Sequence, residues 1–337
     1  MDILFVIIGI SILILIHELG HFLAARKFGI PVEEFGFGFP PRLFARKKGE
    51  TTYSVNLLPF GGFVRLKGEN QWDEVPEADR SRSFSAQPAW KRSAVIVAGV
   101  AMNFLLGWIL MSVIFAIGTP KVVVIAEVLP GSPAETVGIL AQDHIIGFDT
   151  AQAFTDHINA NRGKEIKIDV RRSGKSLIFK AIPRISGEGA LGVAVVEGGI
   201  ERQSLLASII EGFKTSLTII GGIVAAFANL VWGLVTQGRV LVDLVGPIGI
   251  FGVASEAGSF GFIYLVQLVA MISLNLAVLN IFPFPALDGG RFLFILIEKI
   301  KGSPLNRNFE KAVNGAGFLL LLILIIVVTV RDLGKLF

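Results

Sequence analysis

The 337-residue chain contains no cysteine, and only 17% of its residues are charged. Without cysteine it has no disulfide framework, no thiolate nucleophile and no cysteine-ligated zinc site. Soluble proteins carry roughly 25% charged residues, whereas 53% of this chain is hydrophobic. A chain with so little polar surface needs lipid to cover its apolar side chains.

An excess of one charge is also missing, since the formal net charge is +4 and the basic residues are spread along the chain. Proteins that bind nucleic acid concentrate Lys and Arg in a patch or stripe. We therefore expect the lipid bilayer, and not nucleic acid, as a partner.

Long apolar runs are what the sequence has instead. Four of them are long enough to cross a hydrocarbon core of ~30 Å: residues 3–25, 93–117, 262–284 and 312–330. The first lacks the basic start of a cleaved signal peptide and is too long for its apolar segment, so we expect it to be retained. The pattern predicts an α-helical polytopic membrane protein with about four transmembrane helices.

Basic residues fix the expected orientation. They stand just after the first run and just before the second, and throughout the loop between them: Arg26, Lys27, Arg42, Arg46, Lys47, Lys48, Lys91 and Arg92. By the positive-inside rule this loop is cytoplasmic. The N-terminus and the chain from Thr119 onward are then outside.

Residues 121–184 differ from the rest, with short β-branched runs at 122–125 and 166–170 and a turn signal at 172–175. We expect a small soluble α+β domain here. The expected division is 1–117 for the first two transmembrane helices, 119–198 for the outer domain, 199–261 for an extracytoplasmic membrane-associated segment and 262–337 for the last two transmembrane helices.

The first apolar run contains an H-E-x-x-H motif, formed by His17, Glu18 and His21. Residues four apart share one face of a helix, so both imidazoles can reach one metal ion. Glu18 lies beside them, where it can take a proton from a water activated by zinc. A chance match would have to leave three ionisable groups inside an apolar helix, each costing ~2.5–3.5 kcal/mol or more at the bilayer centre.

Asp288 is the expected third ligand, because it directly follows the apolar run at 262–284. Pro283 and Pro285 break that helix, which membrane proteins tolerate only where a cavity or other protein groups satisfy the backbone. The two remaining histidines, His144 and His157, lie in the outer domain, where surface or turn positions are the simpler interpretation.

Two other classes of protein remain open at this point. One is an inactive scaffold that binds membrane partners, which the intact Glu18 disfavours. The other is a metal transporter, which would need ligands along a path, whereas the sequence shows one cluster. A cleavage assay separates the first alternative, and zinc flux into vesicles separates the second.

The H-E-x-x-H motif together with Leu287-Asp288-Gly289-Gly290 resembles the site-2 protease family of intramembrane zinc metalloproteases, most closely its bacterial RseP-like branch. The resemblance extends over nearly the whole chain. It includes a glycine-rich stretch at 35–39, a membrane re-entrant β-loop at 53–67, a PDZ signature at 130–135 and a Gly-Pro segment at 246–250. The fold then gains an inserted PDZ-like domain and a membrane-associated β-hairpin.

The resemblance implies an endopeptidase of the cytoplasmic (inner) membrane, with the PDZ-like domain outside and Zn²⁺ as cofactor. Its substrates would be single-span membrane proteins already trimmed by another protease, such as anti-sigma factors in envelope-stress signalling. It also implies that Asn275 and Asn280 hold the substrate, although asparagine in a membrane helix commonly bonds to other helices.

The sequence departs from the family in its outer domain. Only one PDZ-like unit is present, and the segment 147–150 lacks the usual Asn-Gly turn. Peptide binding by this domain is therefore in doubt, although residues 191–195 could supply a peptide-facing strand.

A fifth uncharged run, at 215–235, is long enough to cross the membrane, but parity predicts that it does not. His17 and His21 lie ~20 Å or more along a helix that enters from outside, towards its cytoplasmic end. Asp288 must reach the same zinc, so the run at 262–284 must also enter from outside. An even number of crossings must then separate Thr119 from residue 262, and only one candidate exists.

Single cysteines at Lys214 and Arg239 test this topology, because the native chain has none to interfere. An impermeant thiol reagent added to intact cells should label both positions. Labelling of Lys214→Cys alone, with Arg239→Cys reached only after permeabilisation, would refute both the topology and the pairing of Asp288 with the histidines.

Overall fold

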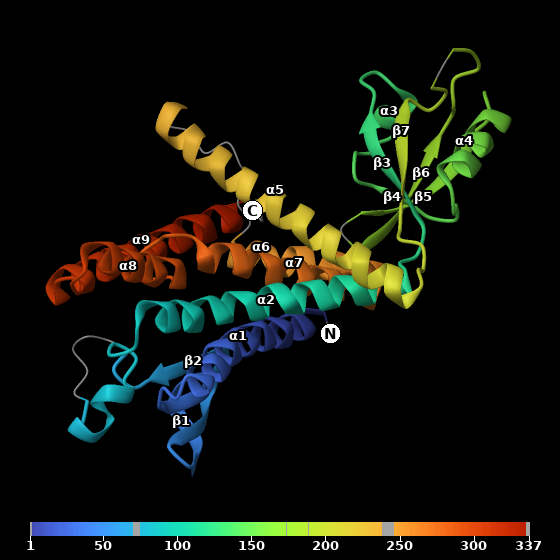
Figure 1. Ribbon diagram of the computed structural model, residues 1–337. Coiled ribbons are helices and arrows are strands. Elements are labelled where there is room, and N and C mark those ends of the chain that lie inside the picture. The colour runs from blue at the N-terminus through green and yellow to red at the C-terminus, as the bar shows by residue number, and fades with distance from the viewer. Residues whose placement is uncertain (1, 70–74, 173, 188, 238–245, 335–337) are drawn as a thin grey trace. The chain divides into compact units, whose positions relative to one another are not determined.

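A computed structural model describes residues 2–69, 75–172, 174–187, 189–237 and 246–334 (Figure 1). The chain forms two compact units. The first, the helical unit, comprises Met1–Ser112, Ile210–Ala254 and Leu265–Phe337, and the second, the sheet unit, comprises Val113–Ile209 and Ser255–Tyr264.

Long apolar helices dominate the structure, as the composition predicts. Five helices are long and apolar enough to cross a membrane: α1 (Asp2–Lys27), α2 (Ala89–Ile117), α5 (Leu205–Gln237), α7 (Phe262–Ile281) and α9 (Arg307–Gly334). Two shorter α-helices are α6 (Pro247–Phe260) and α8 (Asp288–Lys301), and a short 3-10 helix spans Glu77–Arg82.

The five candidate spans among the described residues correspond to the five long apolar runs of the sequence, of which four are expected to cross. The helix α5 contains the run at 215–235, and only 11% of its most apolar window is buried within the protein, against 39% for α1. Length and composition make α5 a candidate, while the parity argument predicts that it does not cross. Lys214 lies within α5, and Arg239 falls outside the described residues.

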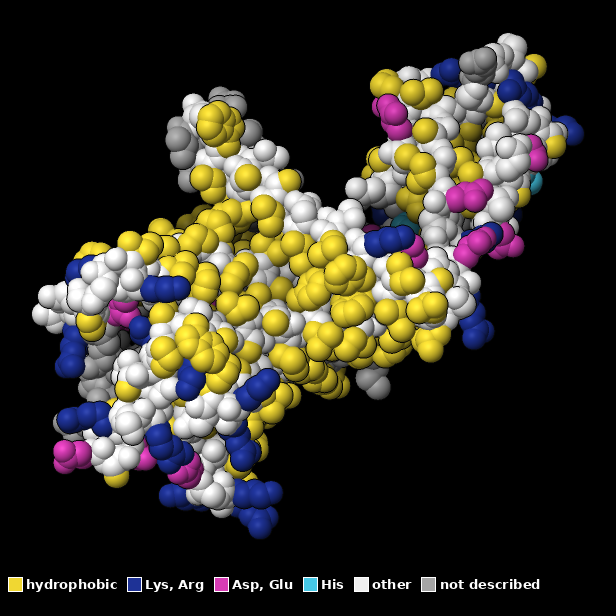
Figure 2. Space-filling model, viewed as in Figure 1, with side chains coloured by type: hydrophobic (Ala, Val, Ile, Leu, Met, Phe, Trp, Pro, Cys, Tyr) yellow, Lys and Arg dark blue, Asp and Glu magenta, His cyan; other side chains and the backbone are white. Residues whose placement is uncertain are grey.

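Hydrophobic side chains cover much of the visible surface of the long helices (Figure 2). Large apolar residues of α9 such as Leu320, Ile323 and Val327 are about half exposed, which is the pattern of a surface that faces lipid. This exposure agrees with a multi-pass membrane protein.

The helices α1 and α2 pack with their backbones in close contact. A Cβ atom on Gly20 would fall 2.7 Å from the carbonyl carbon of Ala98 and 2.8 Å from the Cα of Gly99. Small residues allow this kind of approach, which is how helices associate in lipid. Below the contact, Phe22, Val95 and Ile96 join a core that includes Ile295 of α8.

Residues 53–67, expected to form a β-loop, lie mostly in strand β2 (Thr51–Leu66), which pairs with β1 (Val32–Lys48). The glycine-rich stretch at 35–39 is part of β1, and its residue Phe35 pairs with both Val64 and Tyr53 of β2. The β-structure is therefore more extensive than expected, because the preceding glycine-rich segment supplies the partner strand.

The sheet unit has a five-stranded sheet in the order β6-β5-β4-β3-β7. Its strands are β3 (Val122–Val128), β4 (His144–Ile145), β5 (Ile166–Arg172), β6 (Lys175–Ala181) and β7 (Val193–Gly198), and its helices are α3 (Pro133–Thr136) and α4 (Ala151–Ala160). The two β-branched runs are strands, as expected. Of the turn signal at 172–175, Arg172 ends β5 and Lys175 begins β6, and Ser173 lies outside the described residues. Ser132 and Thr150 cap the two helices through their hydroxyl groups.

An ion pair and a ring contact hold parts of this unit together. The carboxylate of Asp143 is fully buried and accepts two 2.6 Å hydrogen bonds from Arg172. His144 stacks on Phe260, with ring centroids 4.0 Å apart. Its Nδ1 atom is buried and has no hydrogen-bond partner among the described residues.

Acid should destabilise the sheet unit through His144. Burial lowers the pKa of His144, and nearby Arg171 lowers it further, against the opposing effects of Glu256 and Asp143. The folded unit then holds fewer protons at this site than the unfolded chain, so the free energy of unfolding falls as the pH drops through about 6.5 and below. Limited proteolysis of the full-length protein at pH 5 and pH 7.5 should show faster cutting within residues 122–198 at pH 5. The variant His144→Gln should lose much of this difference; an unchanged difference would assign the pH effect to another group.

Candidate metal centre

Two imidazoles converge on one side of α1. His17 and His21 are both buried, and their Nε2 atoms lie 3.1 Å apart. The four-residue spacing of a helix brings the rings together, as the sequence predicts.

Asp288 reaches this pair from the other end of the helical unit's sequence. It is the first residue of α8, and its Oδ2 atom lies 2.8 Å from Nε2 of His17 and 3.3 Å from Nε2 of His21. Two N–H groups between α7 and α8 have partners: Phe284 N–H bonds to the Phe282 carbonyl, and Ala286 N–H bonds to the side chain of Asn314 in α9. The broken helix that Pro283 and Pro285 predicted is therefore what delivers the carboxylate.

The three groups fit a cation better than they fit one another. Nδ1 of His21 faces the carbonyl oxygen of Val95 at 2.9 Å, and a carbonyl only accepts, so Nδ1 carries a proton, and in the neutral imidazole Nε2 then presents a lone pair. That lone pair faces a carboxylate oxygen, which is also an acceptor. Ligand atoms 2.8, 3.1 and 3.3 Å apart are close to the ~3.3 Å separation of neighbouring ligands around tetrahedral zinc with bonds of about 2.0–2.1 Å. The donor set of two imidazoles and one carboxylate suits zinc.

Space for the imidazoles depends on a glycine of α2. A Cβ atom on Gly99 would lie 2.9 Å from Cε1 of His17 and would also collide with Nε2 of His21. Any side chain at this position would therefore displace the metal-facing atoms.

Glu18 lies next to the pair but outside the three-ligand cluster. Its Oε2 atom accepts a 3.0 Å hydrogen bond from the backbone N–H of Val64 in β2. The β-structure thus fixes the orientation of the carboxylate that the sequence analysis expects to act as a base.

The two asparagines of α7 differ in position. Nδ2 of Asn280 lies 3.5 Å from both ring nitrogens of His17, so the structure places this amide at the cluster. The Nδ2 atom of Asn275 bonds to the carbonyl of Met271 in its own helix. The structure therefore brings Asn280, but not Asn275, to the histidines.

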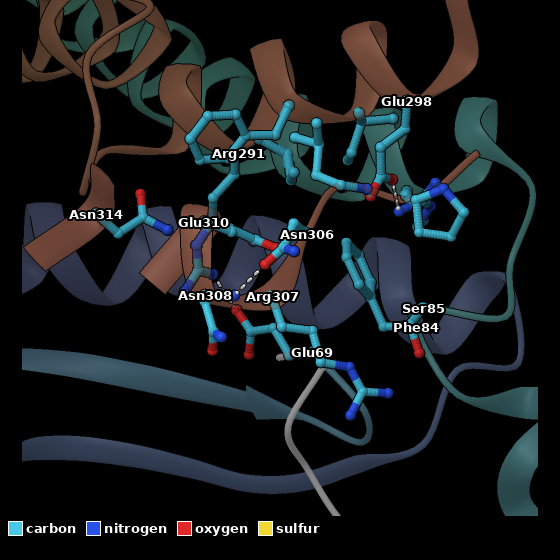
Figure 3. Close-up of a pocket in the computed structure, with 16 residues that line it drawn as sticks. Glu69, Phe84, Ser85, Arg291, Glu298, Asn306, Arg307, Asn308, Glu310 and Asn314 are labelled. Carbon is cyan, nitrogen blue, oxygen red and sulfur yellow. Dashed lines mark hydrogen bonds and ion pairs between the residues drawn. The ribbon is translucent and has the colours of Figure 1, made fainter. Parts of the chain in front are cut away.

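A polar cavity of about 640 Å³ lies beside α8, one turn beyond Asp288 (Figure 3). Arg92 bonds to Glu298 at 2.8 Å, and Arg291 pairs with Glu69 from the end of the β-structure. Burial alone would lower the pKa of Arg291, but the Glu69 and Asp288 carboxylates outweigh it and raise that pKa. The Arg291–Glu69 pair connects α8, which carries Asp288, to the segment that follows β2. The N–H group of Val64 in β2 in turn bonds to Glu18.

Val95, Gly99 and Asn103 line one side of the histidine pair and are not predicted from the sequence. One signal was available, because Asn103 is the lone amide in the apolar run at 93–117. Val95 and Val64 act through backbone atoms, so their side chains carry no signal.

Comparisons with known proteins agree with this geometry. Residues 5–324 match the family described as Peptidase family M50. A protein of Clostridium perfringens named "Putative zinc metalloprotease" is 35% identical over 99% of this chain and 98% of its own length. One of the same name from Fusobacterium nucleatum is 33% identical over the full length of both chains. "Regulator of sigma-W protease RasP" of Bacillus subtilis is 29% identical over 98% of each chain.

Fold, donor set and relatives together define the class: the protein is a zinc metalloprotease with several membrane-spanning helices. The chain belongs to peptidase family M50, the site-2 proteases, which confirms the resemblance noted in the sequence.

Replacing Gly99 by alanine should weaken zinc binding, since the added Cβ collides with the imidazoles. We expect a loss on the order of tenfold to a hundredfold in affinity, the range seen when groups that orient metal ligands are disturbed. Competition with a chromogenic chelator on the purified protein measures it. Ala101→Ser, at an exposed position of the same helix, is the control. Unaltered affinity in Gly99→Ala would show that the histidines do not hold the metal in this arrangement.

Proposed function

We propose that the protein is an intramembrane endopeptidase that cuts the transmembrane segments of single-span membrane proteins after another protease has trimmed them. The observation that carries this proposal is the convergence of His17, His21 and Asp288 within a bundle of apolar helices. A metal-binding cluster within apolar helices would act on a peptide bond that itself lies in the membrane. The relative named "Regulator of sigma-W protease RasP" supports a role in regulated proteolysis, with anti-sigma-factor-like substrates.

His17, His21 and Asp288 would hold the zinc ion, and Glu18 would act as the base. When bound, zinc would supply a Lewis acid that polarises the scissile carbonyl and lowers the pKa of nearby water. Glu18, held by the Val64 N–H, takes the proton from the attacking water and passes it to the leaving amine. Because Glu18 is outside the ligand set, it can change protonation state without releasing the metal.

Substrate binding would use backbone pairing as well as side chains. A helical substrate hides its carbonyl groups in its own hydrogen bonds, so it has to unwind at the cleavage site. An extended segment could then pair with an edge of the β1–β2 structure, whose Val64 adjoins Glu18. Asn280 lies at the cluster and is the stronger candidate for a substrate contact, while we retain Asn275 on the family resemblance alone.

The proposed location is the bacterial cytoplasmic (inner) membrane, with four full crossings and the domain at 119–198 outside as a PDZ-like domain. A five-stranded sheet with the helices α3 and α4 supports a compact domain in this segment. Among the described residues of this segment, no cluster of three or more possible metal ligands is found. We infer that it selects substrates by excluding those that have not been trimmed.

The variant Glu18→Gln should stop proteolysis while zinc stays bound. Loss of a general base lowers a rate by about 10²–10⁴-fold, and the amide keeps the shape of the carboxylate. The measurement is co-expression with candidate single-span substrates, wild type against variant, together with the zinc content of the purified proteins.

His17→Ala and His21→Ala serve as matched controls, because they should lose zinc as well as activity. Cleavage by purified Glu18→Gln near the wild-type rate would contradict the mechanism. Full zinc content in both histidine variants would contradict the assignment of the ligands.

A further inference from the structure

Asn103 of α2 is a fully buried amide that lies against the candidate metal centre. Its Nδ2 atom is 3.3 Å from Nδ1 of His17. With the amide nitrogen in that direction, its Oδ1 atom is buried and has no hydrogen-bond partner among the described residues. Its backbone carbonyl accepts a 2.7 Å hydrogen bond from Ser273 of α7, so the residue is held at its main chain.

The chemistry of His17 decides which end of this amide must face it. Nε2 of His17 is directed at Asp288 and His21, and a neutral imidazole that binds metal through Nε2 carries its proton on Nδ1. An N–H group needs an acceptor, whereas the NH₂ of an asparagine only donates. Turning the carboxamide by 180° places Oδ1 opposite the Nδ1 proton, so that the oxygen gains a donor and the NH₂ group takes the position that Oδ1 held.

The other amide at the cluster has unsuitable geometry for this role. Nδ2 of Asn280 is 3.5 Å from Nδ1 and equally 3.5 Å from Nε2 of His17. The in-plane directions of the two ring nitrogens diverge, so an atom equidistant from both is aligned with neither. Asn103 therefore remains as the group that can fix the tautomer of His17.

A single face of α2 then orients both histidines. Val95, Gly99 and Asn103 are spaced four residues apart, so they lie above one another along the helix. The Val95 carbonyl accepts from His21, Gly99 leaves room for both rings, and the carboxamide of Asn103 lies 3.3 Å from Nδ1 of His17.

We propose that Asn103 is a positioning residue for zinc binding. Its side-chain oxygen accepts a hydrogen bond from the Nδ1–H group of His17 and so directs Nε2 at the metal. The proposal rests on the ligand assignment given above. It predicts that position 103 needs a hydrogen-bond acceptor and not an amide donor.

Two substitutions of similar size separate these requirements. Asn103→Asp keeps the acceptor and removes the donor, and Asn103→Leu removes both. We expect Asn103→Leu to weaken zinc binding by about 10–100-fold and Asn103→Asp to stay within about threefold of wild type, measured by chelator competition. The visible spectrum of the Co²⁺-substituted protein should change in Asn103→Leu and stay close to wild type in Asn103→Asp.

Controls keep the result interpretable. Ser112→Ala removes a hydroxyl from the same helix that bonds to the Trp108 carbonyl, and it should leave zinc affinity unchanged. If Asn103→Leu fails to accumulate, Asn103→Thr and Asn103→Val form a second pair that differs by one acceptor, and Thr should bind zinc more tightly.

Three outcomes would count against the proposal. Wild-type affinity in Asn103→Leu would show that the contact has no role, and equal losses in the Asp and Leu variants would show that the amide donates or only packs. His17→Ala, run in the same assay, tests the ligand assignment separately. Retention of zinc by that variant would overturn the ligand set itself, whereas its loss together with unchanged Asn103→Leu would overturn only the role of Asn103.

Discussion

The structure depends on one electrostatic constraint, which is that a carboxylate and two imidazoles buried among apolar helices must share a cation. Their ligand atoms lie 2.8–3.3 Å apart, and at least two of them are acceptors facing each other. Burial among apolar helices makes such a cluster costly without a bound ion, so under the proposed ligand assignment the metal would also help to hold α1 and α8 together. Stability and catalysis would then depend on the same three side chains.

Several features of the fold serve this cluster. Gly20 and Gly99 let α1 and α2 touch at the backbone, which places the acceptors of α2 within reach of the imidazoles. The break between α7 and α8 brings Asp288 in from the end of an apolar helix. The β-structure adds the Val64 N–H for Glu18, and the Arg291–Glu69 pair connects that segment to α8. Each of these elements contacts the candidate metal centre or Glu18, directly or through a neighbouring segment, by the few contacts named here.

Membrane and site impose opposite requirements on the same residues. Apolar helices are most stable in lipid when they carry no charge, whereas hydrolysis needs a metal, a base and water. The structure concentrates the polar groups in one short section of α1 and satisfies them with backbone carbonyls, N–H groups and a buried amide from neighbouring elements. The outward surfaces of helices such as α9 remain apolar.

The sequence by itself determined the membrane class, the H-E-x-x-H pair, Asp288 as the complementary carboxylate and the strands at 122–125 and 166–170, because periodicity and the cost of charge in lipid are local properties. The tertiary structure decided the rest. It paired β2 with the glycine-rich β1, separated Asn280 from Asn275, and brought Val95, Gly99 and Asn103 to the histidines. These are contacts between segments up to hundreds of residues apart, several made by backbone atoms, so only the packing of the helices could reveal them.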